Sequence, residues 1–249
     1  LSDLRPQHLR GLADKVVEGD GKPLTQTHGR YVQRTLRTYL KAAADEGYEV
    51  HKSIFRMKLM PPSANPRQAL ALEQSVLVLE QAHKHNDHSR WDAAFLQGLR
   101  QGEALGLTWN RVDFANGFIT IDRSLQEVPK NEGGNYTIPE QYRAEQVWGR
   151  FWLVPPKTDA SVRVVPMIPE FQRALEEWRE EAPSNKLGLV WPRPDGKPRL
   201  PEYDRREFRE LQTRAGVAKD GTGALYTVHE ARHSTVSLLL ELNVPREVV

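Results

Sequence analysis

The chain has 249 residues, enough for two domains, and its 39% hydrophobic and 27% charged residues are typical of a globular protein. Cysteine is absent, which excludes disulfides and thiolate chemistry and fits a reducing cytoplasm. No apolar run approaches the length of a membrane span, and the N-terminus has no signal-peptide pattern. We therefore expect a cytoplasmic protein with no membrane partner.

The formal net charge of +2 does not by itself indicate a nucleic-acid partner, but its distribution is uneven. Residues 1–64 contain 11 Lys and Arg against 7 Asp and Glu, whereas residues 65–249 contain 24 against 26. The segment MPPSANPR at residues 60–67 is rich in proline and disfavours helix on both sides. The sequence thus predicts a basic N-terminal domain over 1–64, a linker, and a second domain over 65–249.

The N-terminal domain is predicted to be helical, with one helix over residues 1–21 and a longer one from Thr25 or Thr27 to about Asp45. Four basic residues share one face of the longer helix without interleaved acids: Arg30, Arg34, Arg37 and Lys41. Such a face is usually only solvated. Because acidic partners are missing, we interpret it as a surface that contacts the DNA backbone.

A further helix is predicted over residues 68–86, with Leu72, Val76, Leu79 and Ala82 directed inward. Three histidines follow at the end of this helix: His83, His85 and His88. They match no standard spacing of metal ligands and lie in a polar turn. The sequence therefore predicts no metal site there.

The most informative segment is FLQGLRQGEALGLTWNRVD, residues 95–113. Gly98 can end one helix, and Arg100 then lies near the start of a second with Glu103 three residues further on. Glu103 can bond one edge of the Arg100 guanidinium, leaving the other edge for an anion. The residues alone leave two alternatives open, a buried structural ion pair and an anion-binding site.

The remainder of the chain alternates between short strands and amphipathic helices. A strand is predicted at 118–121 after the Asn116-Gly117 turn, and residues 129–150 are an unusual insertion. Strands at 151–154 and 162–165 bracket a turn containing Lys157. Helices are predicted at 169–182, with Phe171, Leu175 and Trp178 inward, and at 202–215 and 228–242. The fold class is mostly α with a small antiparallel sheet (α+β).

Three segments together resemble the tyrosine recombinase (phage integrase) family. Its first box reads approximately G-x-R-x-x-E-x-x-x-L-x-W-x-x-[VI]-D and matches Gly98, Arg100, Glu103, Leu107, Trp109, Val112 and Asp113. The family's lysine on a β-hairpin matches Lys157 in PKTDASVRVVP, and its H-x-x-R box matches His229 and Arg232 in HEARH. Ala231 departs from the usual leucine. Each box is weak alone, but three in the right order are specific.

The resemblance implies a helical core-binding domain followed by a catalytic domain. Arg100 and Arg232 are then expected to neutralise the scissile phosphate, and Lys157 to protonate the departing 5′-oxygen. His229 is expected to donate to the phosphate or to take the nucleophile's proton, with Glu103 and His233 in supporting roles. The implied activity is site-specific cleavage and rejoining of DNA through a 3′-phosphotyrosyl intermediate, without a cofactor.

The family's nucleophilic tyrosine follows H-x-x-R, together with a later His or Trp. Every tyrosine of this chain precedes His229. We therefore interpret the chain as a fragment that lacks the C-terminal segment and does not cleave DNA, and as incomplete at its N-terminus. The implied partners are double-stranded DNA attachment sites, further copies in a homotetramer on DNA, a host DNA-bending protein and an excision factor. The implied role is integration and excision of a phage or mobile element in a bacterial cytoplasm, associated with the nucleoid.

Two alternatives remain open on the sequence. His229, Glu230 and His233 satisfy H-E-x-x-H literally, the pattern of a zinc metalloprotease with two histidine ligands and a glutamate base. A recombinase fold that only binds DNA is the second alternative, because no tyrosine follows His229.

Overall fold

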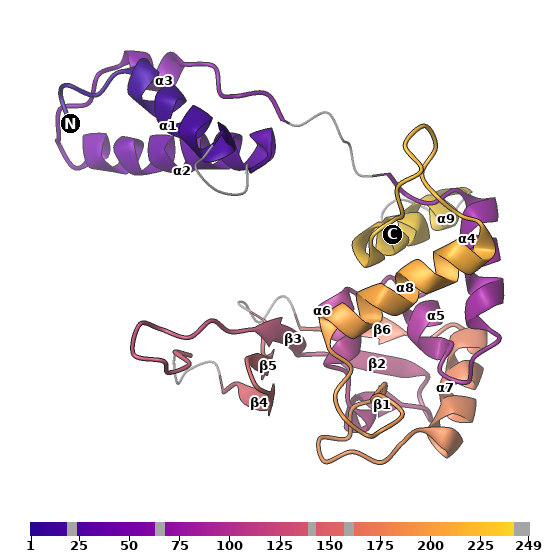
Figure 1. Cartoon of the computed structure of the whole chain (residues 1–249). Helices are drawn as coiled ribbons and strands as arrows, with labels where there is room; N and C mark the ends of the chain where they lie inside the picture. Colours follow the sequence, from indigo (N-terminus) through magenta and orange to yellow (C-terminus); the bar gives the residue numbers. More distant parts are fainter. Residues whose placement is uncertain (19–23, 63–67, 139–142, 157–161, 242–249) are drawn as a thin grey trace. The chain divides into compact units, whose positions relative to one another are not determined.

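The computed structural model describes residues 1–18, 24–62, 68–138, 143–156 and 162–241, the last six of these by backbone alone. The chain divides into two compact units, Leu1–Arg67 and Gln68–Val249 (Figure 1). The division lies at the end of the proline-rich segment 60–67. Among the described helices, none is both long and apolar enough to cross a membrane.

The N-terminal unit consists of α1 (Pro6–Glu18), α2 (Gln26–Asp45) and α3 (Ser53–Arg56). Its core is formed by apolar side chains from all three helices and the turn after α3, namely Leu9, Leu40, Ile54 and Met57. The predicted basic face of α2 is only partly open. Arg30 donates a hydrogen bond to the Met60 carbonyl at 2.7 Å, whereas Arg34 and Lys41 are exposed.

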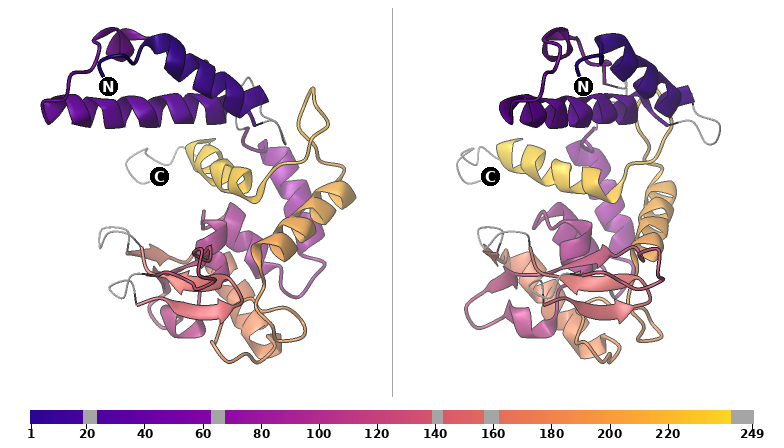
Figure 2. Two further views of the ribbon diagram at one scale, coloured as in Figure 1. Left: turned by 60° about the vertical axis from the view of Figure 1, so that its left-hand side comes forward. Right: turned by 90° about the vertical axis from the view of Figure 1, so that its left-hand side faces the viewer.

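The second unit contains α4 (Leu72–Ala82), α5 (Ser89–Phe95), α6 (Gln101–Leu105), α7 (Pro169–Glu181), α8 (Pro201–Ala215) and α9 (Val228–Glu241). Figures 1 and 2 show α4, α8 and α9 gathered on one side of this unit and the strands on the other. The predicted inward face of α7 is correct, because Phe171, Leu175 and Trp178 are all buried.

The strands form two antiparallel sheets of three strands each. One has the order β1 (Val112–Asp113), β2 (Phe118–Ile121), β6 (Arg163–Pro166); the other has the order β3 (Ser124–Glu127), β5 (Phe151–Val154), β4 (Glu145–Trp148). β5 and β6 therefore belong to different sheets, and the predicted hairpin that pairs them across Lys157 is wrong. Part of the insertion at 129–150 supplies β4, which pairs with β5 in place of β6. These observations confirm the α+β class.

The predicted inward face of α4 is correct for Ala82, which is buried, and for Leu79, which packs against the core, but it is wrong for Leu72 and Val76. Leu72 and Val76 are 44% and 45% exposed, while Ser75 and Val78 are buried. The reason is that polar contacts set the orientation of α4: the Gln74 side chain accepts from the Tyr226 hydroxyl at 2.9 Å and donates to the Ala218 carbonyl at 3.2 Å. Hydrophobic periodicity does not reveal a helix face that is buried through hydrogen bonds.

Candidate active site

The site begins where α5 ends and α6 starts. Gly98 has φ = 60°, a left-handed conformation that glycine adopts without steric cost, and the chain turns there. Arg100 is the N-cap of α6, and its backbone N–H donates to Glu103 Oε2 at 2.9 Å. Gly102 lets α6 pack directly on β3, because a Cβ at this position would lie 2.8 Å from the Leu125 carbonyl oxygen.

Glu103 is the centre of the site. Its side chain is only 8% exposed and forms ion pairs with two arginines. Arg100 Nη1 donates to Oε1 at 2.7 Å, and Arg163 at the start of β6 donates in bidentate fashion at 2.9 and 2.7 Å. The Arg100 side chain remains 58% exposed, so part of its guanidinium still faces solvent.

A third arginine reaches the same carboxylate from α9. Arg232 Nη1 lies 4.0 Å from Glu103 Oε2 and also donates to the Gly98 carbonyl. Thr235, one turn further along α9, donates to the carbonyls of Ala94 and Phe95 at 3.1 and 2.7 Å. The first and last boxes of the sequence are thus brought together, with the guanidinia of Arg100 and Arg232 both within 4.0 Å of one carboxylate.

Three guanidinia around one carboxylate leave an excess of positive charge. Burial alone would raise the pKa of Glu103, but the hydrogen bonds from Arg163 and Arg100 outweigh it and lower that pKa from 4.5 to about 2. Burial and then the charges of Arg100 and Arg163 lower the pKa of Arg232, while Glu103 opposes that shift. Because arginine keeps its charge, this arrangement favours a bound anion such as phosphate.

The position of Arg100 is supported by a buried ion pair that the sequence analysis missed. Arg90 on α5 donates two hydrogen bonds to Asp204 on α8, at 2.9 and 2.7 Å, and neither side chain is exposed. Gln101, the residue after Arg100, donates to the same carboxylate at 2.8 Å. The bidentate pair therefore anchors the N-terminus of α6 between two helices.

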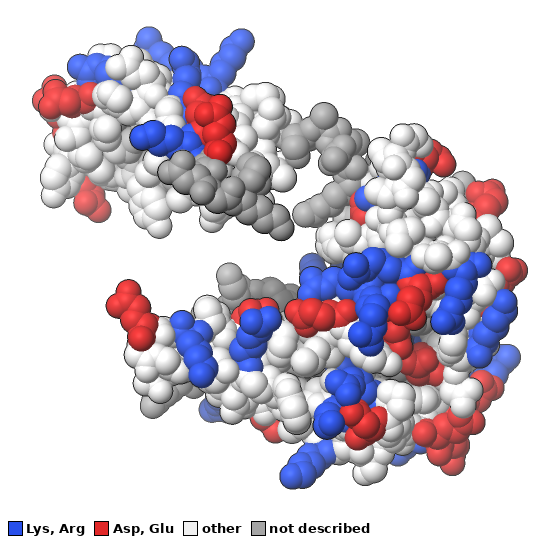
Figure 3. All heavy atoms as spheres, viewed as in Figure 1, with Lys and Arg blue, Asp and Glu red and all other residues white. Residues whose placement is uncertain are grey.

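A hollow of about 370 Å³ opens beside Arg100 and Glu103. Its other lining residues come from β2, β3 and the segments beside these strands: Gly102, Ile121, Arg123, Ser124, Gln126 and Pro156. Lys157 follows directly in sequence but lies outside the described residues. On the face seen in Figure 3, basic and acidic side chains are interspersed across this unit. The attraction for an anion is therefore local to the site.

His229 and Arg232 lie one turn apart on α9, and His229 is exposed. The His229 and His233 rings meet edge to face, with centroids 4.7 Å apart. Glu230 instead caps its own helix: its side chain accepts from the Thr227 N–H at 2.8 Å and from Lys219 Nζ at 2.8 Å. A carboxylate committed to these contacts is poorly placed as the general base of a metalloprotease, and nothing in the described residues supports that alternative.

Tyr226 precedes α9 but is not placed as a nucleophile. It is 5% exposed, and its hydroxyl donates to Gln74 on α4 at 2.9 Å. Burial raises the pKa of the Tyr226 hydroxyl, against a smaller opposing effect of the Gln74 contact. Tyr226 is therefore a structural residue of the α4–α9 region.

Arg163 is the site residue that the sequence analysis did not identify. It pairs with Ile121 of β2 in the sheet register, which places its side chain beside α6. The available signal was an arginine in the strand after Lys157, but only the β2–β6 pairing shows that it reaches Glu103.

Comparison with known proteins supports the resemblance drawn from the three segments. No protein-family model matches the chain. A tyrosine recombinase XerC-like protein of Caldanaerobacter subterraneus subsp. tengcongensis is 27% identical over 235 residues, covering 86% of this chain and 55% of that protein. An integrase of Saccharopolyspora erythraea is 24% identical and covers 98% of this chain and 63% of that protein. The chain thus spans between half and two thirds of the length of these relatives.

Solved structures show the same fold. The integrase of transposon Tn1549, in complex with transposon right end DNA, superposes with a TM-score of 0.76 at 18% identity, covering 99% of this chain and 76% of that one. A lambda integrase tetramer bound to a Holliday junction gives 0.61 at 14% identity, covering 100% and 63%. The chain therefore has the fold of the tyrosine recombinases, and the resemblance seen in its sequence is confirmed.

Proposed function

We propose that the chain forms the core of a site-specific recombinase that breaks and rejoins double-stranded DNA. The observation that carries this proposal is the convergence of Arg100, Arg163 and Arg232 on Glu103, which leaves net positive charge at an open hollow. A structural ion pair needs one arginine for one carboxylate. Arg163 is bound to Glu103 in bidentate fashion, which leaves Arg100 and Arg232 to donate to a dianionic transition state at phosphorus.

In the proposed reaction a tyrosine oxygen attacks the scissile phosphorus while Arg100 and Arg232 neutralise the non-bridging oxygens. The P–O bond to the tyrosine forms and the P–O5′ bond breaks. The tyrosine's proton passes to a base, for which His229 is our candidate, and the 5′-oxygen takes a proton, for which Lys157 is our candidate. The 3′-phosphotyrosyl linkage conserves the bond energy, so the strands can rejoin without ATP.

The wider role that we propose is integration and excision of a phage or mobile element in a bacterial cytoplasm. Attachment-site DNA is the expected partner, with a homotetramer assembling on it and with a DNA-bending protein and an excision factor taking part. Complexes of the Tn1549 and lambda integrases with DNA support the choice of DNA as partner. In unit 1 the exposed residues of the basic face of α2, Arg34 and Lys41, are proposed to contact DNA phosphates.

Residues 1–249 alone are expected to bind DNA without forming a covalent bond to it. The phosphate contacts are electrostatic and need only the arginines, but no tyrosine follows His229. The test is incubation with a nicked suicide duplex, followed by a native and a denaturing gel. A shifted native band without a covalent denaturing band is predicted; a covalent band that Tyr226→Phe abolishes would overturn the assignment of Tyr226.

The basic face of α2 is expected to set part of the salt dependence of DNA binding. Each neutralised phosphate contributes about 0.9 to the slope of log K against log salt. Replacing Arg34 and Lys41, the exposed residues of this face, with alanine should therefore lower the slope by about 2. Fluorescence anisotropy of labelled DNA across a salt series measures the slope for each variant.

A charge-matched control is available on the same unit: Lys15 and Lys52 are exposed and lie outside this face of α2. If Lys15→Ala with Lys52→Ala changes the slope as much as Arg34→Ala with Lys41→Ala, the face of α2 has no special contact with DNA.

A further inference from the structure

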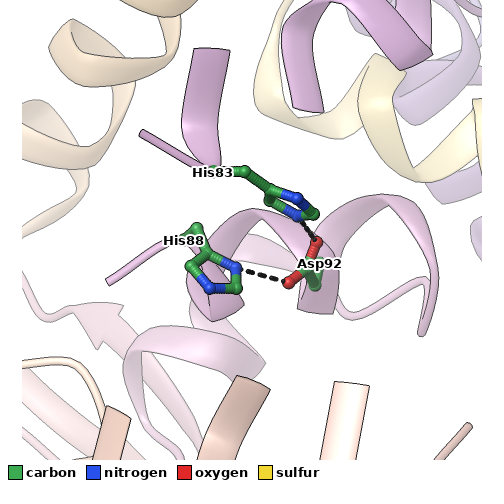
Figure 4. Close-up of side chains that lie close together, drawn as sticks. All are labelled: His83, His88 and Asp92. Atoms are coloured by element: carbon green, nitrogen blue, oxygen red, sulfur yellow. Dashed lines mark hydrogen bonds and ion pairs between the residues drawn. The ribbon is translucent and has the colours of Figure 1, made fainter. Parts of the chain in front are cut away.

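The turn between α4 and α5 brings together three side chains with metal-binding chemistry, none of which belongs to the site proposed above. His83 is the C-cap of α4, His88 the N-cap of α5, and Asp92 lies one turn into α5. Figure 4 shows the two imidazoles on either side of the Asp92 carboxylate. His83 Nε2 lies 2.9 Å from Oδ1, and His88 Nδ1 lies 3.0 Å from Oδ2.

The potential ligand atoms are already close to the geometry of a metal centre. One nitrogen of each histidine and one Asp92 oxygen all lie within 4.8 Å of one another. Metal–ligand bonds of about 2.0–2.2 Å in a tetrahedral site place neighbouring ligands about 3.3–3.5 Å apart. The His83 Nε2–Oδ1 and His88 Nδ1–Oδ2 distances of 2.9 and 3.0 Å, each to a different Asp92 oxygen, are shorter than this by only a few tenths of an ångström.

The backbone holds these three residues in place before any ligand binds. His83 N–H donates to the Leu79 carbonyl at 2.8 Å, and Asp92 N–H donates to the His88 carbonyl at 3.2 Å. The Asp92 side chain is 4% exposed. His83 and His88 are held at the end of α4 and the start of α5. Pre-ordering of this kind reduces the entropy that binding an ion would otherwise cost.

The surroundings provide both access and negative charge. A hollow of about 210 Å³ borders the two histidines and is also lined by Lys84, His85, Asn86, Glu177 and Glu181, with two carboxylates against one lysine. Asn86 donates to Glu181 of α7, which connects the turn to that helix. The hollow therefore leaves room for a water molecule to complete the coordination.

We propose that His83, His88 and Asp92 bind a divalent transition-metal ion of the zinc class, which fastens α4 to α5. Two imidazoles and one carboxylate are ligands that Zn²⁺ and Co²⁺ accept. Each coordinating nitrogen must offer a lone pair, so the ring hydrogen that now points at Asp92 moves to the opposite ring nitrogen or is released. The sequence predicts no metal here because the spacing of the histidines is unusual; the fold adds Asp92 as the third ligand.

The test is titration of untagged, chelator-treated residues 1–249 with Zn²⁺ by calorimetry and with Co²⁺ by visible absorption. We expect one ion per chain, an intense Co²⁺ spectrum typical of a tetrahedral site, and a higher melting temperature with Zn²⁺. Removing one ligand should weaken binding by more than the roughly 100-fold that loss of an outer hydrogen-bond partner costs. His83→Ala is the first variant to use, because His83 is half exposed and its loss should leave the fold intact.

Two control variants test whether other histidines account for the binding of the ion. His85→Ala removes a histidine of the same turn that lies outside the cluster, and it should bind the ion like the unmodified chain. His229→Ala disrupts the H-E-x-x-H pair and should also leave binding unchanged. Failure of the unmodified chain to bind Zn²⁺, or loss of binding in His229→Ala but not in His83→Ala, would overturn the proposal.

Discussion

Replacing Arg232 with alanine is expected to slow DNA cleavage about 100-fold or more, a loss of at least ~2.7 kcal/mol of transition-state stabilisation. This is the loss of rate that other enzymes show when one hydrogen-bond donor to a developing oxyanion is removed. Arg232 and Arg100 approach the same carboxylate from α9 and from the N-terminus of α6, so Arg100→Ala should have an effect of similar size. The measurement is single-turnover cleavage by a protein that contains this chain together with the nucleophilic tyrosine.

The conservative variant Arg232→Lys keeps the charge but loses the planar fork, and it should recover only part of the rate. Arg206 on α8 is a suitable control, because its side chain is 62% exposed and it lies away from Glu103. Arg206→Ala should cleave like the unmodified protein. If the cleavage rate of Arg232→Ala falls less than tenfold and the fold is intact, Arg232 does not contact the scissile phosphate.

Replacing Glu103 with glutamine is expected to destabilise unit 2 by about 3–5 kcal/mol at neutral pH, the range for breaking a buried ion pair. Without the carboxylate, the guanidinia of Arg100, Arg163 and Arg232 face one another with no compensating charge. Urea unfolding of residues 1–249 measures the change in free energy. Glu210→Gln is the matched control, because the Glu210 side chain on α8 is 52% exposed.

The same substitution has a defined pH dependence. The pKa of Glu103 is about 2 in the folded chain against an ordinary value of 4.5. Because the folded pKa is the lower one, the charged carboxylate stabilises the fold above about pH 4.5, by about 3 kcal/mol. That contribution is lost as the pH falls from about 4.5 towards 2. The difference between the unmodified chain and Glu103→Gln should therefore shrink over this range; a constant difference would contradict the charge-based account.

The two arginines of the boxes could be predicted from sequence because they occur in contiguous patterns. Gly98, Arg100 and Glu103 lie within six residues, and a turn followed by a helix start suffices to place them together. The same holds for α7, whose apolar residues recur with helical period and are buried. Local patterns of this kind depend little on the rest of the fold.

What could not be predicted depends on contacts between distant segments. Arg163 reaches Glu103 only because β6 pairs with β2, whereas the sequence suggested pairing with β5. The buried Arg90–Asp204 pair joins residues 114 positions apart. Asp92 contacts His83 nine residues earlier, across the turn between α4 and α5. In each case a polar group is buried through a partner that no local pattern reveals.

The central claim is that Arg100 and Arg232 hold a single DNA phosphate. The most direct test selects a duplex with the unmodified protein and then replaces each phosphate in turn with an uncharged methylphosphonate. We predict one linkage at which neutralisation weakens binding by the unmodified protein about tenfold or more, the size of a charged hydrogen bond, and weakens binding by Arg232→Ala less, because only Arg100 then remains at that phosphate. Equal penalties for both proteins at every linkage would contradict the account.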